Sequence, residues 1–356
     1  MNKEIILDDL REIYDRRIDW EQLRNKTVLI TGPNGMMASY LMFMLIFLNE
    51  EKHMNIQIIA MARSLENFNA RFNEYSSAEY ITVITDSISK PICIDGDIDY
   101  IIHAASFASP QYYDVCPVDV MSPNVIGTYY LLQLAAEKKV SGFIMFSSAD
   151  VYGKITGNKD SITENDMGAL DPLDIHSCYS ESKRMAETMC SCFYHQYDVP
   201  VKILRICHTF APTMNLNKDP RVFASFMKNI VNGEDIELKS DGMAKRAFIY
   251  IADAVAGIFT VLTKGQNGEA YNLVNTDAFV TIRELAETLT SIRKDIKLNV
   301  KFKQRQKEEH YTENAHIGFI PPSNEKLKQL GWEAKYNIYD GFERVWQYFD
   351  ENRQNT

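Results

Sequence analysis

Short apolar runs alternate with longer stretches of helical periodicity between Thr27 and Ile206, and this alternation constrains the fold more than any other feature. Runs rich in β-branched residues are typical of strands buried on both faces, which occur in parallel sheets covered by helices. The stretches between the runs supply the helical connections that parallel strands require. We therefore predict an α/β fold with a doubly wound parallel sheet. The predicted strands span residues 27–31, 56–62, 80–85, 100–105, 142–148 and 201–206.

The chain extends beyond this alternation on both sides. Residues 1–26 are charged and amphipathic, which predicts a helical extension packed on the body. Residues 27–205 are expected to form the sheet domain, because the alternation loosens after that point. Residues 206–356 are expected to form mainly a smaller α/β lobe, with some segments returning to the sheet domain. The charged run at 301–314 predicts a solvated loop or a sheet edge.

Charge and composition argue against several classes of function. The net charge of -10 disfavours nucleic acid or an anionic membrane as the main partner, because phosphate binding depends on Lys and Arg. The longest apolar run, from Tyr40 to Leu48, has nine residues, whereas a membrane span needs about 20. The six cysteines include no pair of CxxC motifs, so no metal site is predicted. Reduced thiols and a charged N-terminus without a signal sequence favour a cytoplasmic protein.

A glycine turn directly follows the first predicted strand, in TVLITGPNGMMASYL. The spacing Gly-x-x-Gly-x-x-Ala permits a tight turn, a close approach of the backbone to a pyrophosphate, and close packing of helix on strand. A strand before the turn and a helix after it are the context that dinucleotide binding requires. A purely structural turn is the alternative. The predicted cofactor contacts here are Gly32, Asn34, Gly35, Met36 and Met37.

The end of the second predicted strand bears on which dinucleotide binds. NAD selectivity usually requires a carboxylate at this point, whereas an arginine accommodates the extra phosphate of NADP. Ala62 followed by Arg63 favours NADP and leaves NAD open, since an exposed arginine at a strand end is common. Asp86, after the third strand, could accept a hydrogen bond from the adenine amino group or could cap a helix. The other predicted cofactor contacts are Ser87, Ala104, Ala105 and Ser106.

A phenol and an ammonium share one face of a predicted helix in the stretch CYSESKRMAE, which begins at Cys178. Tyr179 and Lys183 are four residues apart, so their side chains are neighbours. An ammonium group favours the phenolate form of a neighbouring tyrosine and lowers its pKa, which suits the phenol to proton transfer. The alternative is an ordinary polar pair on a helix surface. Ser148, at the end of the fifth predicted strand, is expected at the same edge of the sheet.

These stretches together resemble the extended short-chain dehydrogenase/reductase family, in particular its nucleotide-sugar epimerases, dehydratases and decarboxylases. The resemblance runs from Thr27 to Trp332. It implies a Rossmann-type sheet domain and a smaller C-terminal lobe that binds a nucleotide-diphosphate sugar. The other stretches that carry it are HAASFAS from 103, SPNVIGTYYLL from 122, FSSADVYG from 146, RICHTFAP from 205, DGMAKRAFIYIADA from 241, AYNLVN from 270 and EKLKQLGW from 325.

The resemblance implies a catalytic triad of Ser148, Tyr179 and Lys183. Tyr179 would take the proton from a sugar hydroxyl while hydride leaves for a tightly bound NAD or NADP, which gives a 4-keto sugar. Ser148 would donate a hydrogen bond to the substrate oxygen, and Lys183 would also bind the nicotinamide ribose. Such enzymes commonly serve surface-polysaccharide synthesis.

The resemblance also implies substrate contacts in the second half of the chain. Arg221 and Arg246 match positions where the family places cations for the diphosphate, and His208 matches a polar position that reaches the substrate. Each arginine could instead lie on the surface or bridge the two lobes. Asn124 matches an asparagine that supports the active-site helix.

Two positions after the triad serine bear on the reaction. Dehydratases of the family carry an Asp–Glu pair where this chain has Ala149 and Asp150, which disfavours 4,6-dehydration. The overall resemblance is greatest to UDP-glucuronate decarboxylases, while a 4-epimerase would need only the triad and a retained cofactor. Asp150 could act as a base beside the keto group, or it could cap a helix. Two further alternatives are an NADPH-dependent ketone or nucleotide-ketosugar reductase and a non-catalytic cofactor sensor or scaffold.

Family members commonly pair through two helices, which predicts a homodimer. The corresponding stretches here are NVIGTYYLLQLA and SKRMAETM. We expect apolar residues of these helices, such as Leu131, Leu132 and Met185, to be available for that contact.

Overall fold

A seven-stranded parallel sheet forms the centre of the computed structural model, which describes residues 4–157, 159–303 and 320–354. Its strands are β1 (Thr27–Thr31), β2 (Gln57–Ala62), β3 (Ile81–Thr85), β4 (Tyr100–His103), β5 (Gly142–Ser148), β6 (Val201–Ile206) and β10 (Glu269–Leu273). They follow the spatial order β10-β6-β5-β4-β1-β2-β3. The order reverses between β1 and β4, which is where doubly wound sheets bind ligands. The predicted fold class and all six predicted strands are confirmed.

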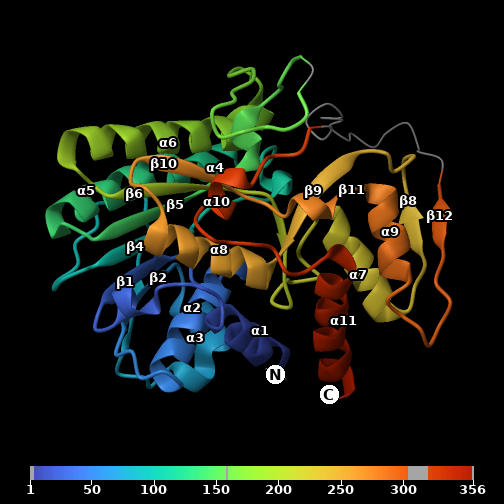
Figure 1. The fold of residues 1–356 in the computed structure, drawn as a ribbon, viewed down its shortest axis with the longest axis horizontal. Helices are drawn as coiled ribbons and strands as arrows, with labels where there is room; N and C mark the ends of the chain where they lie inside the picture. Colours follow the sequence, from blue (N-terminus) through green and yellow to red (C-terminus); the bar gives the residue numbers. More distant parts are fainter. Residues whose placement is uncertain (1–3, 158, 304–319, 355–356) are drawn as a thin grey trace.

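Helices cover both faces of this sheet (Figure 1). Side chains alternate along each strand, so that Ile30 packs toward one helix layer and its neighbour Leu29 toward the other. No helix in the described ranges is both long and apolar enough to cross a bilayer. The layer on one face comprises α2 (Met36–Glu50), α3 (Leu65–Phe72) and α8 (Ile251–Lys264), and the layer on the other comprises α5 (Thr128–Lys138) and α6 (Cys178–Tyr197).

The helix predicted in the stretch NVIGTYYLLQLA is part of a longer helical segment that begins before it. Helix α4 (Pro117–Ser122) leads into a π-helical turn (Pro123–Gly127), and α5 follows without a break. Leu131 and Leu132 are fully buried against the protein's own sheet. The expectation that they are available for contact with a second chain is therefore wrong, because both pack into the core. Met185 on α6 is half-exposed and remains available.

The residues after β6 divide between the lobe and the large sheet. In the lobe, β7 (His208–Phe210), β9 (Lys245–Tyr250) and β11 (Phe279–Thr281) form one small sheet, and β8 (Ile236–Leu238) pairs with β12 (Val300–Phe302). Helices α7 (Val222–Asn232), α9 (Ile282–Thr290) and α11 (Ile338–Gln354) pack with these strands (Figure 1). By contrast, α8 and β10 return to the large sheet, and α10 (Glu325–Lys328) packs on β10. The charged run predicted as a loop or edge enters β12, and from residue 304 it lies outside the described residues.

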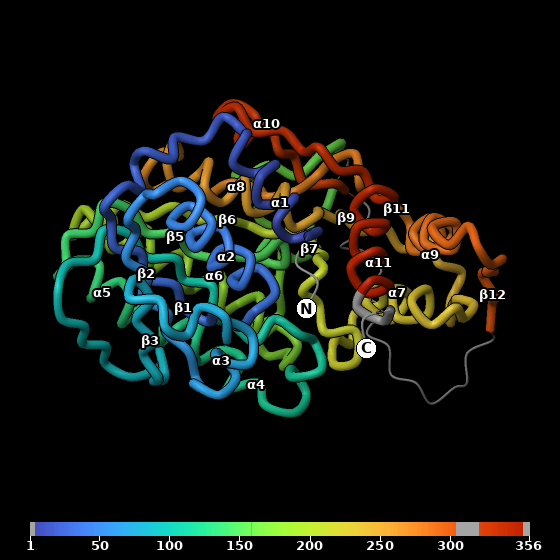
Figure 2. Tube along the Cα trace, turned by 90° about the horizontal axis from the view of Figure 1, so that it is seen from below, coloured from blue at the N-terminus to red at the C-terminus, as the bar shows by residue number. Residues whose placement is uncertain are grey.

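The N-terminal extension joins the two parts of the molecule. It consists of α1 (Glu4–Tyr14) and a 3₁₀ turn (Trp20–Leu23), and α1 contacts α2, α8 and α11 (Figure 2). The carboxylate of Asp9 is fully buried at this junction. It accepts hydrogen bonds from the Tyr40 hydroxyl of α2 at 2.9 Å, the Tyr250 hydroxyl at 2.6 Å and Arg344 Nε of α11 at 2.9 Å. A single side chain of the extension thus connects the glycine-turn helix with the C-terminal helix.

Candidate active site

The glycine turn joins β1 to α2 at the carboxyl edge of the sheet. Gly32 has a φ of +67°, a conformation that other residues rarely adopt. A Cβ atom at this position would lie 2.9 Å from the Cα of Ala105, so only glycine permits this close approach of two loops. Gly35 precedes Met36, the first residue of α2. The N–H groups of a first helical turn lack intrahelical acceptors, and they favour an anion at this point.

Thr31, the last residue of β1, ties this turn to the end of β4. Its hydroxyl oxygen accepts the N–H groups of Ala104 at 3.2 Å and Ala105 at 3.1 Å, and the hydroxyl lies 3.0 Å from His103 Nδ1. Burial lowers the pKa of His103 to about 3, so the ring is neutral and Nδ1 can accept the Thr31 proton. The Ser106 hydroxyl is buried without a partner among the described residues. The tight turn, the helix N-terminus and this unpaired hydroxyl together fit a dinucleotide cofactor.

Three further predicted cofactor residues belong to the same turn. Asn34 donates a hydrogen bond to the carbonyl of Asn67 at 2.6 Å, which anchors the turn to α3. Met36 and Met37 are half-buried at the start of α2. The Met36 carbonyl accepts the Thr213 hydroxyl at 3.3 Å, so the cofactor helix also contacts the segment after β7.

The residues expected to select the dinucleotide lie at the ends of β2 and β3. Arg63 is exposed, and its guanidinium lies 4.5 Å from the centroid of the Phe107 ring. Asp86 is exposed and accepts the N–H of Ser87 at 2.6 Å. Arg63 therefore has a packing role that requires no phosphate partner.

Helix α6 places Tyr179 and Lys183 on one buried stripe. The two residues are 6% and 2% exposed, which excludes the alternative of a surface pair. Lys183 Nζ lies 5.7 Å from the centroid of the Tyr179 ring and donates to the carbonyl of Phe146 in β5 at 2.6 Å. Tyr113, from the segment between β4 and α4, stacks on Tyr179 with ring centroids 5.8 Å apart.

The ionisation of this pair differs from the expectation. Burial raises the pKa of the Tyr179 phenol, and the Asp150 carboxylate raises it further, while a hydrogen bond with Ser148 and the charge of Arg221 lower it. Burial also lowers the pKa of Lys183 to about 7. The expectation that the ammonium lowers the tyrosine pKa is wrong here, because the burial that holds the two groups together disfavours both charges.

Ser148 ends β5 and connects Tyr179 with Asp150. Its Oγ accepts the N–H of Asp150 at 3.2 Å, and its hydroxyl lies close enough to the phenol and to the carboxyl group to lower the pKa of both. The Asp150 side chain is partly open to solvent. The surrounding protein nevertheless desolvates its carboxyl group and raises the pKa, while the positive charge of Arg246 lowers the pKa and only partly offsets this effect. A carboxyl group with a raised pKa can hold or release a proton closer to neutral pH.

The lobe contributes three of the predicted substrate residues. Arg221 directly precedes α7, pairs with Asp219 through an Nη2–Oδ2 distance of 2.6 Å, and lies over the Phe223 ring at 4.6 Å. Arg246 of β9 donates to the Lys245 carbonyl at 2.8 Å. Burial lowers the pKa of His208 to about 3, and both arginines contribute, so the ring is neutral. Two cations and a neutral donor or acceptor thus lie close together, an arrangement that suits a diphosphate.

Asn124 supports the catalytic helix from behind. It is fully buried in the π-helical turn and donates to the Val120 carbonyl at 3.1 Å and to Ser182 Oγ at 3.0 Å. Ser182 in turn donates to the carbonyl of Tyr179 at 2.8 Å. The side chain therefore fixes the turn of α6 that carries the phenol.

Sequence reasoning missed several residues of this site. Tyr113 lies in an irregular segment, where no periodicity marks it. Two residues could have been found from their neighbours in the sequence. Thr31 is a hydroxyl residue directly before the glycine turn, and Asp219 is an acidic residue two positions before Arg221. In the described part of the chain, no three His, Cys, Asp or Glu side chains are grouped so as to hold a metal ion.

Comparison with known proteins places this chain in a family. UDP-glucuronic acid decarboxylase 6 of Arabidopsis thaliana is 30% identical over 318 residues, which cover 89% of this chain and 87% of that protein. A dTDP-glucose 4,6-dehydratase from Streptomyces venezuelae, solved with NAD bound, has a TM-score of 0.75 at 22% identity and covers 92% of this chain and 98% of its own. A UDP-glucuronic acid 4-epimerase from Bacillus cereus, also solved with NAD, has a TM-score of 0.74 at 19% identity, with 92% and 99% covered.

The profile of the family described as NAD dependent epimerase/dehydratase matches residues 28–274. This match confirms the resemblance to the extended short-chain dehydrogenases and reductases, and nothing in the comparisons supports the preference for NADP. The chain belongs to the NAD-dependent epimerase/dehydratase family and is a nucleotide-sugar-modifying enzyme.

Proposed function

We propose that this enzyme oxidises C4 of a UDP-linked hexuronate, decarboxylates the resulting β-keto acid and reduces C4 again, as a UDP-glucuronate decarboxylase does. The similarity over 89% of the chain to such a decarboxylase supports the substrate class. The observation that carries the chemistry is the contact of Ser148 with both Tyr179 and Asp150. It brings one group for proton transfer at the C4 oxygen and a second for proton transfer at the neighbouring carbon.

The first step requires a base at the C4 hydroxyl. Tyr179 takes that proton and Ser148 holds the substrate oxygen, while Lys183 lies behind the phenol. When bound in the glycine turn, an oxidised nicotinamide dinucleotide would supply the hydride acceptor for this step and the hydride donor for the last step.

The second step needs a proton donor rather than a metal or a further cofactor. Once C4 is a ketone, the C5–carboxylate bond breaks, carbon dioxide leaves, and the electron pair remains on the sugar as an enolate. Asp150, whose pKa is raised by desolvation, donates the proton to C5. Tyr179 finally returns its proton to the C4 oxygen as hydride re-adds. A 4-epimerase would use Tyr179 in the same way but would leave Asp150 without a chemical role.

We infer that the cofactor is NAD, held through the catalytic cycle. The family is NAD-dependent, and Arg63 lies over Phe107. The glycine turn and the unpaired Ser106 hydroxyl supply the contacts for the dinucleotide.

The experiment begins with mass spectrometry of the cofactor that co-purifies with the protein. The purified protein is then incubated with UDP-glucuronate and with a panel of UDP-, GDP-, CDP- and dTDP-sugars, without added cofactor. Release of carbon dioxide and a UDP-pentose is expected, and Tyr179→Phe should retain the cofactor but lose turnover. Epimerised UDP-hexuronate as the only product would exclude decarboxylation. A strict requirement for added NADPH would favour a reductase, and full activity of Tyr179→Phe would contradict the proposed chemistry.

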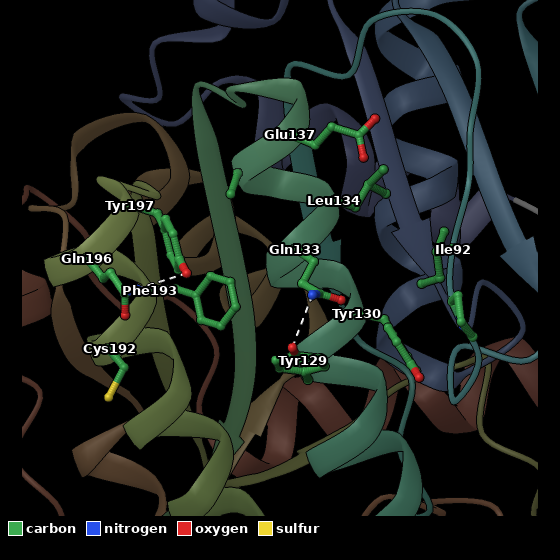
Figure 3. A pocket seen from close by; sticks show the side chains of 12 residues that line it. Ile92, Tyr129, Tyr130, Gln133, Leu134, Glu137, Cys192, Phe193, Gln196 and Tyr197 are labelled. Carbon is green, nitrogen blue, oxygen red and sulfur yellow. Dashed lines mark hydrogen bonds between the residues drawn. The ribbon is translucent and has the colours of Figure 1, made fainter.

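We further propose that the enzyme is a homodimer that pairs through α5 and α6. A pocket lies between these helices and the segment around Ile92, with Tyr129 and Gln133 on one side and Phe193 and Tyr197 on the other (Figure 3). Several exposed apolar and aromatic side chains grouped on two adjacent helices are typical of a protein–protein contact. The exposed large apolar side chains on and beside α5 and α6 include Ile126, Tyr129, Met185, Tyr194 and Tyr197.

A further inference from the structure

Helix α6 carries a third buried polar side chain in line with the catalytic pair. Glu187 follows Lys183 by four residues, just as Lys183 follows Tyr179, so all three lie on one stripe of the helix. Glu187 is 8% exposed. The proposed chemistry uses the first two residues and leaves the carboxylate without a role.

The Glu187 carboxylate binds the ends of two adjacent strands. Its Oε1 accepts the Ser147 hydroxyl of β5 at 2.5 Å and Arg205 Nε of β6 at 3.1 Å, and its Oε2 accepts Arg205 Nη2 at 2.7 Å. Ser147 and Arg205 are register partners in the sheet. The carboxylate therefore connects α6 to both strands, close to the sheet edge that carries Ser148.

Ser147 stands between two residues that the site depends on. The Phe146 carbonyl before it accepts the Lys183 ammonium at 2.6 Å, and Ser148 after it contacts Tyr179. A hydrogen bond that holds Ser147 thus restrains both the lysine and the substrate-binding hydroxyl. The same carboxylate also acts on Lys183 directly: burial lowers the pKa of the lysine, and the charge of Glu187 opposes that effect.

We propose that Glu187 is a positioning residue for the reaction, which holds the end of β5 through Ser147 and favours the ammonium form of Lys183 over the neutral amine. The effect of Glu187 on turnover rests on the proposed function, whereas its contacts with Ser147 and Arg205 do not. A carboxylate that served only as a structural partner of Arg205 would restrain the strands but would leave the charge state of Lys183 unchanged.

The first test measures unfolding of the full chain and does not depend on turnover. Melting temperatures are measured from pH 8 to pH 6 for four proteins: the wild type, Glu187→Gln, Lys183→Met and the double variant. The effect of Glu187→Gln is then compared between the background with Lys183 and the background with Met at that position. Loss of the carboxylate lowers the folded-state pKa of Lys183 further, so the wild type should gain stability over Glu187→Gln as the pH falls through about 7. With Met at position 183 the difference between the two should not change with pH. If the difference in melting temperature between the proteins with Glu and with Gln at position 187 is the same at every pH in both backgrounds, Glu187 has only a structural role and the proposal is overturned.

The second test measures turnover, once a substrate has been identified. Glu187→Gln should shift the alkaline limb of the kcat profile to lower pH by about one unit. Ser147→Ala keeps the carboxylate, so it should lower kcat with no shift of the profile. An unshifted profile in Glu187→Gln contradicts the proposal. If the wild type converts no nucleotide sugar, the proposed function fails. The melting temperatures of the first test would still show whether Glu187 affects the charge of Lys183.

Discussion

The rings of Tyr113 and Tyr179 lie nearly parallel, with centroids 5.8 Å apart and an angle of 15° between their planes. Tyr113 comes from an irregular segment, whereas Tyr179 stands in the first turn of α6. Phe107 and Tyr112 of the same irregular segment pack with Tyr179 in a small apolar cluster. Because the segment lies over the phenol, its aromatic side chains determine how far Tyr179 is shielded from water.

The first prediction concerns this stacked pair. Tyr113→Ala should lower kcat by roughly tenfold, because stacked aromatic pairs contribute about 0.5–1.5 kcal/mol and the phenol would become both mobile and better solvated. Tyr113→Phe keeps the ring and should retain most of the activity. Steady-state kinetics of both variants, with circular dichroism to verify folding, test the stack. Equal losses in the two variants would show that the Tyr113 hydroxyl, and not its ring, matters.

The second prediction concerns the close approach at Gly32. Gly32→Ala should abolish cofactor retention, because the added Cβ would lie 2.9 Å from the Cα of Ala105 and must displace a loop. Gly96→Ala is the matched control: Gly96 also has a positive φ, of +81°, but no atom lies within 4 Å of the added Cβ. The control should lose only the conformational cost of about 1 kcal/mol and keep its cofactor. Cofactor content after gel filtration and thermal unfolding of both variants distinguish contact from backbone strain.

The third prediction separates the two proton-transfer steps. Asp150→Asn leaves Ser148, Tyr179 and Lys183 in place, so oxidation at C4 should still occur. Proton delivery to C5 should become slow, because an amide cannot donate the proton that the carboxyl of raised pKa provides. Stopped-flow measurement with UDP-glucuronate should show rapid cofactor reduction followed by slow product release. Normal turnover in this variant would remove Asp150 from the chemistry.

Local patterns were enough to predict the frame of this protein. Each buried strand is a short apolar run, so its existence depends on residues adjacent in the sequence; β1, β5 and β6 have the predicted bounds. The pairing of Tyr179 with Lys183 depends on a helical spacing of four, which is equally local. The Glu187 position follows the same spacing and could have been noticed.

What the sequence did not reveal depends on tertiary contacts. Burial determines the ionisation of Tyr179 and Lys183, and no spacing reports burial. Leu131 is buried against the protein's own sheet, a contact that the apolar character of the residue alone does not reveal. The stack of Tyr113 on Tyr179 requires an irregular segment to fold back over α6, and such segments carry no periodic signal.

The fourth prediction concerns oligomeric state. Met185→Asp places a charge on the exposed face of α6 and should convert the proposed dimer to a monomer, with little change in monomer stability because the residue is 50% exposed. Leu65→Asp, at a residue of α3 that is 49% exposed on the opposite side of the sheet, is the matched control. Light scattering should give a monomer mass for Met185→Asp alone. A wild-type monomer would exclude the dimer, and dissociation of both variants would locate no interface.

The last prediction concerns the N-terminal extension and pH. Burial raises the pKa of Asp9 to about 6, although Arg344, Tyr250 and Tyr40 oppose this. A carboxyl group whose folded-state pKa lies above its unfolded value binds its proton more tightly in the folded protein. Its contribution to stability is therefore complete below about pH 4 and is lost as the pH rises through 6. Over that range the wild type should lose roughly 3 kcal/mol relative to Asp9→Asn, which does not titrate. Asp8→Asn, at an exposed residue of the same helix, is the matched control for loss of a carboxylate from α1. Denaturant unfolding of the three proteins from pH 4 to pH 7 provides the measurement, and parallel curves for the wild type and Asp9→Asn would show that Asp9 does not titrate in this range.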